Sequence, residues 1–317
     1  MKAAVLETYG ELPVYKEIAA PTAKNADEIV VSPIASSIKN LDKGKAAGRH
    51  YTDFGELPAI MGMDGVAKTA DGQLIYAMGI SGMMAEKAIV NKNEMIVLPE
   101  NLNPTLAAGL PNALMGSDMA LTSRGKIKAD DVVLVNGATG MTGMLAVQMA
   151  KFHGASFVIA TGRNTEKLSK LTEIGADLTI DLTQSDEQIE EAVKSAYAEH
   201  PFDIWIDYLW GNPAELIFKA LSEIKITKAL KVVTVGGMAG SEISLPSQIL
   251  RSRDITIIGS GIGALTAQEI KSYMTETLKA VFDYAANHGL YMDLNEFPLS
   301  EITQAWQGNQ VVVRMDQ

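Results

Sequence analysis

The chain has 317 residues, of which 47% are hydrophobic, and this length and composition suit a globular protein of about two domains. Its net charge of −11 argues against nucleic acid as a main partner, because phosphate binding needs a basic surface. The sequence contains no cysteine, which excludes disulfides and thiolate metal sites.

The sequence also lacks the signals of a membrane protein. No apolar run reaches the roughly 18 residues that a membrane-spanning helix needs. Residues 1–7 lack the longer apolar core of a signal peptide and are typical of a first strand. We therefore expect a cytoplasmic protein with neither a membrane nor a nucleic acid as its partner.

The region up to about residue 110 is rich in short strand patterns. Asp71-Gly72 is a tight hairpin signal between two of these strands. Short strands joined by turns predict a small barrel. A helix should follow over residues 104–121, interrupted near Pro111. The expected strands are residues 1–7, 28–34, 65–69, 74–77, 84–90 and 95–98.

From Asp131 onward, apolar strands alternate with helical stretches. This order is typical of βαβ units and a parallel sheet. Six such strands predict a doubly wound, Rossmann-type nucleotide domain in an α/β protein. The expected strands are residues 132–135, 157–160, 178–180, 204–207, 232–235 and 255–258.

The C-terminal part should return to the first domain. A long amphipathic helix is expected over residues 266–288, and residues 311–313 form a short strand that needs a sheet to join. We therefore predict one domain from residues 1–112 and 266–317, and a second from residues 113–265.

The most informative stretch is a glycine-rich turn between the strand at 132–135 and the helix after Gly143. Strand, glycine turn and helix form the context that a dinucleotide-binding fingerprint needs. Gly140 and Gly143 fit the second and third glycines of G-x-G-x-x-G, with Ala138 at the first. Backbone N–H groups at such a helix start face the phosphates. An ordinary strand-to-helix turn is the alternative. The expected cofactor contacts are Thr139, Gly140, Met141 and Thr142.

The end of the next strand indicates which nicotinamide cofactor binds. NAD-binding proteins place a carboxylate there for the ribose 2′-hydroxyl, whereas this sequence has Gly162-Arg163-Asn164 and no carboxylate before Glu166. The guanidinium of Arg163 suits a 2′-phosphate, and Lys167 adds positive charge. We therefore predict NADP(H). The alternative is a solvated Arg163 beside an Asn164 that caps the next helix.

Four segments together carry a family resemblance. Residues 35–42 resemble A-S-I-N-P-V-D, residues 58–65 resemble P-x-x-x-G-x-D-G, residues 137–143 resemble A-A-x-G-G-V-G, and residues 308–313 resemble a closing G-K-V-V-L. In this order, they are similar to the medium-chain dehydrogenase/reductase superfamily, in its zinc-independent quinone oxidoreductase branch. The resemblance covers nearly the whole chain. It implies a GroES-like β-barrel-type catalytic domain built from both ends, a Rossmann domain between, and a cleft where they meet.

The resemblance also bears on metal. Zinc-dependent relatives use cysteine and histidine ligands, but this sequence has no cysteine, and Met63-Asp64 replaces the G-H-E type segment. We therefore expect no zinc and no other metal site. Without a Lewis acid, a simple carbonyl is not strongly polarised. The expected small-molecule substrate is a quinone or an α,β-unsaturated carbonyl, which accepts hydride readily.

The resemblance implies catalytic roles for Asn40, Asp42 and Tyr51. Lys39 aligns with the family asparagine and Asn40 is one position late, so either could face the substrate. Asp42 could instead bond backbone in the helix that follows. Tyr51 matches a tyrosine that lines the quinone site in some relatives and could stack or donate a proton, or it could be a packed loop tyrosine. Asn112 falls where relatives approach the nicotinamide, with a core helix start as the alternative.

Two further glycine turns follow the fifth and sixth strands of the expected parallel sheet. Ligands bind at the carboxyl ends of parallel strands, so these turns are expected to approach the nicotinamide and ribose. Two ordinary turns are the alternative. The residues are Gly236, Gly237 and Met238 in the first turn, and Gly259, Ser260 and Gly261 in the second.

These observations predict an NADPH-dependent, zinc-independent reductase. A non-catalytic NADPH-binding redox sensor or partner-binding protein would carry the same glycine turn and Arg163. An alcohol or aldehyde oxidoreductase is a weaker enzymatic alternative. The apolar strand at residues 255–258 would leave an open sheet edge, so we also expect a homodimer through this edge.

Overall fold

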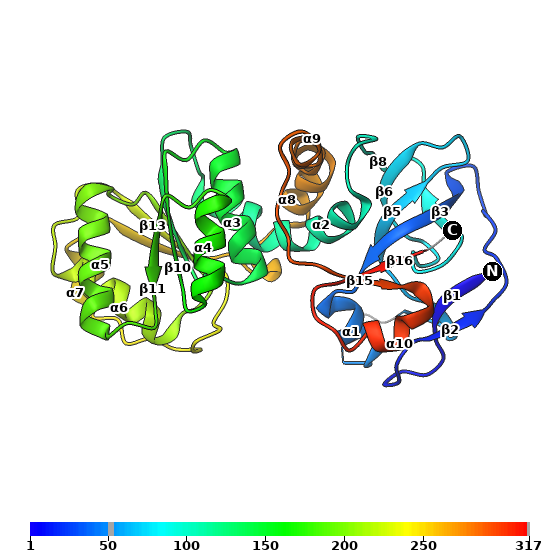
Figure 1. The fold of residues 1–317 in the computed structure, drawn as a ribbon, viewed down its shortest axis with the longest axis horizontal. Helices are drawn as coiled ribbons and strands as arrows, with labels where there is room; N and C mark the ends of the chain where they lie inside the picture. Colours follow the sequence, from blue (N-terminus) through cyan, green and yellow to red (C-terminus); the bar gives the residue numbers. More distant parts are fainter. Residues whose placement is uncertain (50–53, 316–317) are drawn as a thin grey trace. The chain divides into compact units, whose positions relative to one another are not determined.

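The computed structural model describes residues 1–49 and 54–315, and it is a mixed α/β protein (Figure 1). The chain divides into two compact units, the first formed by Met1–Asn112 with Lys271–Gln317 and the second by Ala113–Ile270. Helix α2 (Pro104–Met119) leads from the first unit into the second. Among the described residues, no helix is long and apolar enough to span a membrane.

The second unit is built on one parallel sheet of six strands. The strand order is β11-β10-β9-β12-β13-β14, so the direction of winding reverses beside β9, as in a doubly wound fold. All six expected strands are confirmed, with bounds that shift by at most two residues. They are β9 (Val132–Asn136), β10 (Phe157–Gly162), β11 (Leu178–Asp181), β12 (Ile204–Asp207), β13 (Leu230–Thr234) and β14 (Ile255–Gly259).

Helices cover this sheet and bury its central strands. Strands such as β9 are buried at every residue, which explains their continuous apolar sequence. Helices α5 and α6 lie side by side (Figure 1), and the core beneath them includes Trp205, Phe218 and Tyr197. The helices are α3 (Met141–Phe152), α4 (Thr165–Glu173), α5 (Asp186–Glu199), α6 (Gly211–Ser222) and α7 (Ser247–Arg251).

The first unit contains two sheets. A three-stranded sheet has the order β2-β1-β4, and a seven-stranded sheet has the order β15-β16-β3-β5-β6-β8, with β7 paired to β3. The expected strands of this region are all present, although that predicted from residue 84 begins at Ala88. The strands are β1 (Lys2–Leu6), β2 (Val14–Glu17), β3 (Glu28–Ser37), β4 (Ala59–Ile60), β5 (Asp64–Lys68), β6 (Leu74–Met78), β7 (Ala88–Asn91), β8 (Ile96–Val97), β15 (Asn295–Pro298) and β16 (Val311–Arg314).

Two connections predicted from the sequence, a hairpin and the return of the C-terminal tail, are present in this unit. The hairpin at Asp71-Gly72 joins β5 to β6, and Gly72 adopts φ +88°, where glycine is favoured. The C-terminal strand β16 pairs antiparallel with β3, which confirms that the tail joins a sheet formed by the first part of the chain. Short helices complete the unit: α1 (Asn40–Ala46), the 3₁₀ turn η4 (Leu299–Glu301) and α10 (Ile302–Ala305).

Two helix predictions need correction. The interruption expected near Pro111 is wrong, because α2 is continuous from Pro104 to Met119. Proline removes one helical hydrogen bond, but buried neighbours such as Leu110 and Leu114 fix the helix on both sides of it. The helix expected over residues 266–288 is present with a π-helical insert. It comprises α8 (Ala267–Ser272), η3 (Tyr273–Thr277) and α9 (Leu278–His288). A second π-helical segment, η1 (Ala120–Gly125), directly follows α2, and η2 (Ile262–Ala264) is a short 3₁₀ helix.

Candidate functional site

The glycine turn between β9 and α3 requires glycine at particular positions. Gly137 adopts φ +88°, which lets the chain reverse directly after the strand. A Cβ on Gly143 would lie 2.5 Å from the carbonyl oxygen of Gly137 and 2.8 Å from the Cα of Ala138. The helix therefore packs against the turn at a distance that only glycine permits. Gly140 differs, because its Cβ would meet only the Gly137 oxygen, at 3.8 Å.

The start of α3 has the properties of an anion site. Gly140 is the N-cap residue and provides no side chain to accept from the helix. The N–H groups of Met141, Thr142 and Gly143 are the helix's first donors and have no carbonyl partner within it. The helix dipole adds positive potential at this end. Open space at Gly140 and free donors beside it fit a cofactor pyrophosphate.

Behind the turn, three polar side chains form a row across the ends of three adjacent strands. Asn136 on β9 is in register with Thr161 on β10 and with Asp207 on β12. Asn136 Nδ2 donates to Asp207 Oδ1 at 2.6 Å, and Thr161 Oγ1 donates to Asn136 Oδ1 at 2.6 Å. The Gly137 N–H donates to Thr161 Oγ1 at 3.2 Å, so the row anchors the first residue of the turn.

Asp207 is the ionisable member of this row. Burial raises the pKa of Asp207 to about 6, against hydrogen bonds from Asn136 and from the N–H of Trp210 that favour its charged form. Trp210 adopts φ +51°, a sparsely populated conformation for a bulky residue. Its N–H donates to Asp207 Oδ2 at 2.9 Å, which helps to hold the strained residue in place.

The end of β10 presents the residues predicted to select the cofactor. Gly162 lies against Thr139, because a Cβ on Gly162 would overlap the Thr139 methyl group. Arg163 follows and is exposed. Asn164 caps α4, since its Oδ1 accepts from the N–H of Lys167 at 2.9 Å. The alternative role of Asn164 is therefore observed, while the phosphate role of Arg163 and Lys167 stays a prediction.

The turns after β13 and β14 differ in how tightly they are packed. A Cβ on Gly236 would lie 2.9 Å from the Tyr208 oxygen, and one on Gly237 would lie 2.7 Å from the Gly240 oxygen, so backbone packing requires both glycines. Met238 is 83% exposed. The second turn is open: Cβ atoms on Gly259 and Gly261 would meet nothing within 4 Å, and the buried Ser260 Oγ has no partner among the described residues.

The predicted cofactor residues of the second unit thus gather at the carboxyl ends of the strands of one sheet. The turn at Gly140, the corner at Arg163 and the turns after β13 and β14 all follow the carboxyl ends of parallel strands. In open α/β sheets, ligands bind at the carboxyl ends of the strands. The geometry fits the predicted nucleotide, although no contact with it is described.

The predicted substrate residues of the first unit lie at the start of α1. Asp42 Oδ2 accepts from the N–H of Lys39 at 2.9 Å, which is the backbone bond that the sequence left open. Lys39 is buried, and its Nζ lies 2.5 Å from Asp64 Oδ1, whereas Asn40 is exposed. Of the two neighbours, Lys39 therefore enters the protein interior, and Asn40 faces outward from the first unit.

These buried groups shift one another's ionisation. Burial alone would lower the pKa of Lys39, but the carboxylates of Asp64 and Asp42 outweigh it and raise this pKa. Burial raises the pKa of Asp42, opposed by the Lys39 ammonium. Burial, with the nearby Asp64 carboxylate, also raises the pKa of the Tyr76 phenol well above its ordinary value. The ammonium of Lys39 therefore stays charged over the physiological range.

The other predicted residues are placed as follows. Tyr51 lies outside the described residues. Asn112 is exposed within helix α2, away from the helix start, and it is the last residue of the first unit. Among residues 1–49 and 54–315, no group of three or more His, Cys, Asp or Glu side chains could hold a metal ion.

Sequence reasoning missed two features of the site. The row of Asn136, Thr161 and Asp207 could have been found from one signal, because each is the one polar side chain of an otherwise apolar strand and is its last or next-to-last residue. The pair of Lys39 and Asp64 carried no such signal, since 25 residues separate two charges that look like ordinary surface groups in the sequence.

The chain is similar to proteins of known families. Residues 142–280 match the family described as zinc-binding dehydrogenase. The chain is 27% identical to a probable NADPH-dependent quinone reductase of Emericella nidulans, covering 99% of each protein. It is 31% identical to a chloroplastic NADPH-dependent alkenal/one oxidoreductase of Arabidopsis thaliana, over 60% of this chain and 54% of that protein. These matches support the predicted resemblance to the medium-chain dehydrogenase/reductase superfamily.

Within this superfamily, the relatives it resembles are named as quinone and alkenal/one reductases. The crystal structure of the quinone oxidoreductase from Thermus thermophilus has the same fold, with a TM-score of 0.70 at 23% identity over 99% of this chain and 100% of that one. The superfamily and the fold predicted from the four sequence segments are therefore confirmed. The matching family is named for zinc, but this chain has no cysteine. In the segment where zinc-dependent relatives have a histidine ligand, it has Met63-Asp64, and Asp64 pairs with Lys39.

Proposed function

We propose that this chain is an NADPH-dependent reductase that transfers hydride to a quinone or an α,β-unsaturated carbonyl. The observation that carries the proposal is the open glycine turn at Gly140, followed at the end of β10 by Arg163 instead of a carboxylate. Two relatives support the reaction, since they are named as an NADPH-dependent quinone reductase and an NADPH-dependent alkenal/one oxidoreductase.

Residues of the second unit would hold the cofactor. The N–H groups of Met141 and Thr142 at the start of α3 would bind the pyrophosphate, and Arg163 with Lys167 would bind the 2′-phosphate. The row ending in Thr161 would keep the turn in its binding shape. When bound, NADPH supplies the hydride, while the protein orients it and the acceptor.

We further propose that the reaction needs no zinc. The sequence offers no thiolate, and Met63 stands where a histidine ligand would be. An acceptor without metal activation must take hydride readily, which favours quinones and enones over simple carbonyls. Tyr51 or water would supply the proton. Asp42 is better placed for positioning, because it fixes the backbone at Lys39 and hence the adjacent Asn40.

We also propose a homodimer through the edge of the parallel sheet. Strand β14 lies at this edge, and Thr256 and Ile258 on it are exposed. Pairing with a second copy would satisfy the open backbone groups of the strand. Light scattering at micromolar concentration should give twice the chain mass, and Ile258→Lys should give the mass of one chain. A wild-type monomer would overturn this part of the proposal. The cytoplasmic location stays a prediction.

The decisive experiment for the reaction is NADPH consumption, followed by near-ultraviolet absorbance, with a flat ortho-quinone and a simple enone in parallel. We expect turnover with at least one acceptor, and a strong preference for NADPH over NADH. A simple alcohol with NADP⁺ serves as the comparison for the oxidoreductase alternative. Tight NADPH binding without turnover of any acceptor would replace the enzyme with a redox sensor.

A further inference from the structure

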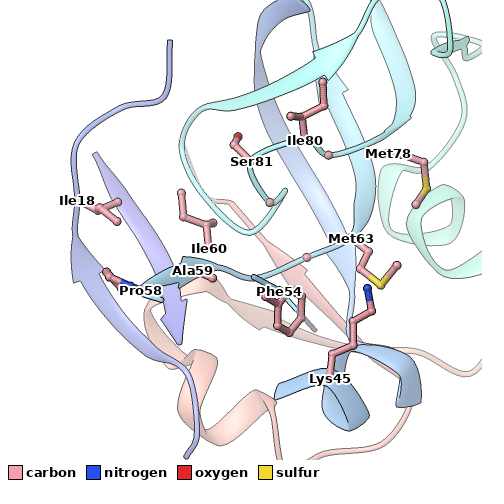
Figure 2. A pocket seen from close by; sticks show the side chains of 13 residues that line it. Ile18, Lys45, Phe54, Pro58, Ala59, Ile60, Met63, Met78, Ile80 and Ser81 are labelled. Carbon is pink, nitrogen blue, oxygen red and sulfur yellow. The ribbon is translucent and has the colours of Figure 1, made fainter. Parts of the chain in front are cut away.

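The first unit contains a pocket of about 460 Å³ (Figure 2), and its lining includes Met63, which stands where zinc-dependent relatives have a histidine ligand. This volume lies in the range of small-molecule sites. Its walls come from the end of α1, the segment around β4 and the turn after β6. The lining residues are Ile18, Lys45, Phe54, Pro58, Ala59, Ile60, Gly62, Met63, Met78, Gly79, Ile80, Ser81 and Gly82.

Backbone hydrogen bonds fix two walls of the pocket against each other. The N–H of Gly79 donates to the Met63 oxygen at 2.8 Å, and the N–H of Met83 donates to the Gly62 oxygen at 2.8 Å. Gly82 packs so closely on Ile60 that a side chain there would overlap the Ile60 carbonyl. The shape of the pocket is therefore formed without a ligand, which lowers the entropic cost of binding.

Most side chains that line the pocket are apolar, with Ser81 as a polar one, and the backbone of its glycines adds polar atoms. Met78 and Ile80 are 44% and 57% exposed, a high exposure for large apolar side chains. Thioether side chains such as those of Met63 and Met78 adapt to ligands of different outline. Among the described lining residues, Lys45 is the one ionisable group, so the pocket combines apolar side chains and uncharged polar atoms with a single positive charge.

The ammonium of Lys45 has no ion pair or hydrogen bond with any described residue. Figure 2 shows its side chain extending from α1 toward Phe54 and Met63, and its Nζ lies 5.6 Å from the centre of the Phe54 ring. The ring attracts the cation weakly and holds it in place. By contrast, the neighbouring Lys43 donates to the Gly308 oxygen at 2.6 Å. Lys45 is thus a half-buried cation that lacks an anionic partner among the described residues.

We propose that this pocket binds a small organic monoanion, with a flat apolar body and one carboxylate or ionised hydroxyl group. The apolar body would cover Met78 and Ile80, and the anionic group would pair with the Lys45 ammonium. A neutral ligand of the same shape would desolvate Lys45 without giving it a partner, and a cationic ligand would be repelled. The site selects its ligand by charge as well as by shape, and binding there does not depend on the reaction proposed above.

Methionine-methyl NMR on the full chain tests this directly, with 2-naphthoate as the probe. The methyl signals of Met63 and Met78 are assigned by Met63→Leu and Met78→Leu. We expect 2-naphthoate to shift both signals in a saturable way, and 2-naphthylmethanol, its neutral counterpart, to bind at least tenfold more weakly. Equal binding of the two probes, or no shift at either methyl group, would overturn the proposal.

Three variants separate the charge of Lys45 from its packing. Lys45→Met should weaken 2-naphthoate binding about 10- to 100-fold, as expected for loss of a hydrogen bond to a charged group. It should not weaken 2-naphthylmethanol binding, because the neutral probe no longer has to desolvate an ammonium group. Lys45→Arg should retain binding. Lys16→Met removes the same charge from a surface pair with Glu7 and should have no effect. If Lys45→Met, with an unchanged melting temperature, binds 2-naphthoate like the wild type, Lys45 is not the anion's partner.

Discussion

The Nζ of Lys39 lies 2.5 Å from Oδ1 of Asp64, and both side chains are more than nine-tenths buried. Such a pair gains little over apolar residues of the same volume, because removing two charges from water costs about as much as their attraction returns. Breaking it is different, since the remaining charge is then buried without a partner. The stability of the first unit therefore requires either both charges of the pair or neither of them.

Lys39→Met should therefore destabilise the first unit by roughly 3–5 kcal/mol, because Asp64 would keep a buried charge without its partner. Hydrogen exchange should rise in peptides from β3 and β5 and stay unchanged in peptides from β9 and β10 of the second unit. Lys39→Met combined with Asp64→Leu is the control, and it should recover most of the lost stability. A double variant as unstable as the single one would show that the charge left on Asp64 is not the cause, and would point to Asp42, the other buried carboxylate that faces Lys39.

The glycine turn yields a prediction that separates binding from folding. Gly140→Ala should leave the melting temperature nearly unchanged, because its Cβ would meet no atom closer than 3.8 Å, yet weaken NADPH binding at least tenfold by filling the space for the pyrophosphate. Gly143→Ala should lower both the melting temperature and the affinity for NADPH. Its Cβ would lie 2.5 Å from the Gly137 oxygen in the turn, and such overpacking costs about 1–3 kcal/mol. Calorimetric titration with NADPH beside thermal unfolding measures the two effects. Undiminished NADPH binding by Gly140→Ala would place the pyrophosphate elsewhere.

The sequence predicted the framework of the molecule better than its polar interior. The strands of the parallel sheet were predictable because both faces of strands such as β9 are buried, which forces a continuous apolar run. The glycine turn was predictable because Gly140 and Gly143 stand between a strand and a helix at the spacing of a nucleotide fingerprint. These are local constraints, and local patterns record them.

Features set by tertiary contact were not predictable. Asn136 and Asp207 are 71 residues apart, and only the strand order places them side by side. The break expected at Pro111 did not occur because packing around α2 outweighs the local preference of proline. The choice between Lys39 and Asn40 also needed the fold, since only the position of Asp64 decides which of them is drawn inside.

Arg163→Ala tests the cofactor preference. Arg163 is exposed at the end of β10 and would give the 2′-phosphate charge-assisted hydrogen bonds, so its loss should weaken NADPH binding roughly 10- to 100-fold and leave NADH unaffected. Calorimetric titration with each cofactor measures this. Arg251→Ala, which removes another exposed arginine from α7, is the matched control. Equal losses for NADPH and NADH would mean that Arg163 supports the turn and does not recognise the phosphate.

The last prediction concerns pH and Asp207. Burial raises its pKa from 3.8 to about 6, so the folded protein holds this proton more tightly than the unfolded chain does. The resulting stability is fully present below about pH 4 and is lost as the pH rises through 6. At 1.36 kcal/mol per unit, the loss by pH 7 is about 3 kcal/mol.

Asp207→Asn cannot ionise, so its stability relative to the wild type should rise by about 3 kcal/mol between pH 4 and pH 7. Urea unfolding of both proteins across this range measures the difference, and titrations common to both cancel. Asp181→Asn is the control of opposite sign: hydrogen bonds from Thr183 lower the pKa of Asp181, so its contribution is present at neutral pH and is lost on acidification. A difference between Asp207→Asn and wild type that does not change with pH would show that Asp207 titrates alike in the folded and unfolded chains, and that its burial in the row with Asn136 does not hold the proton.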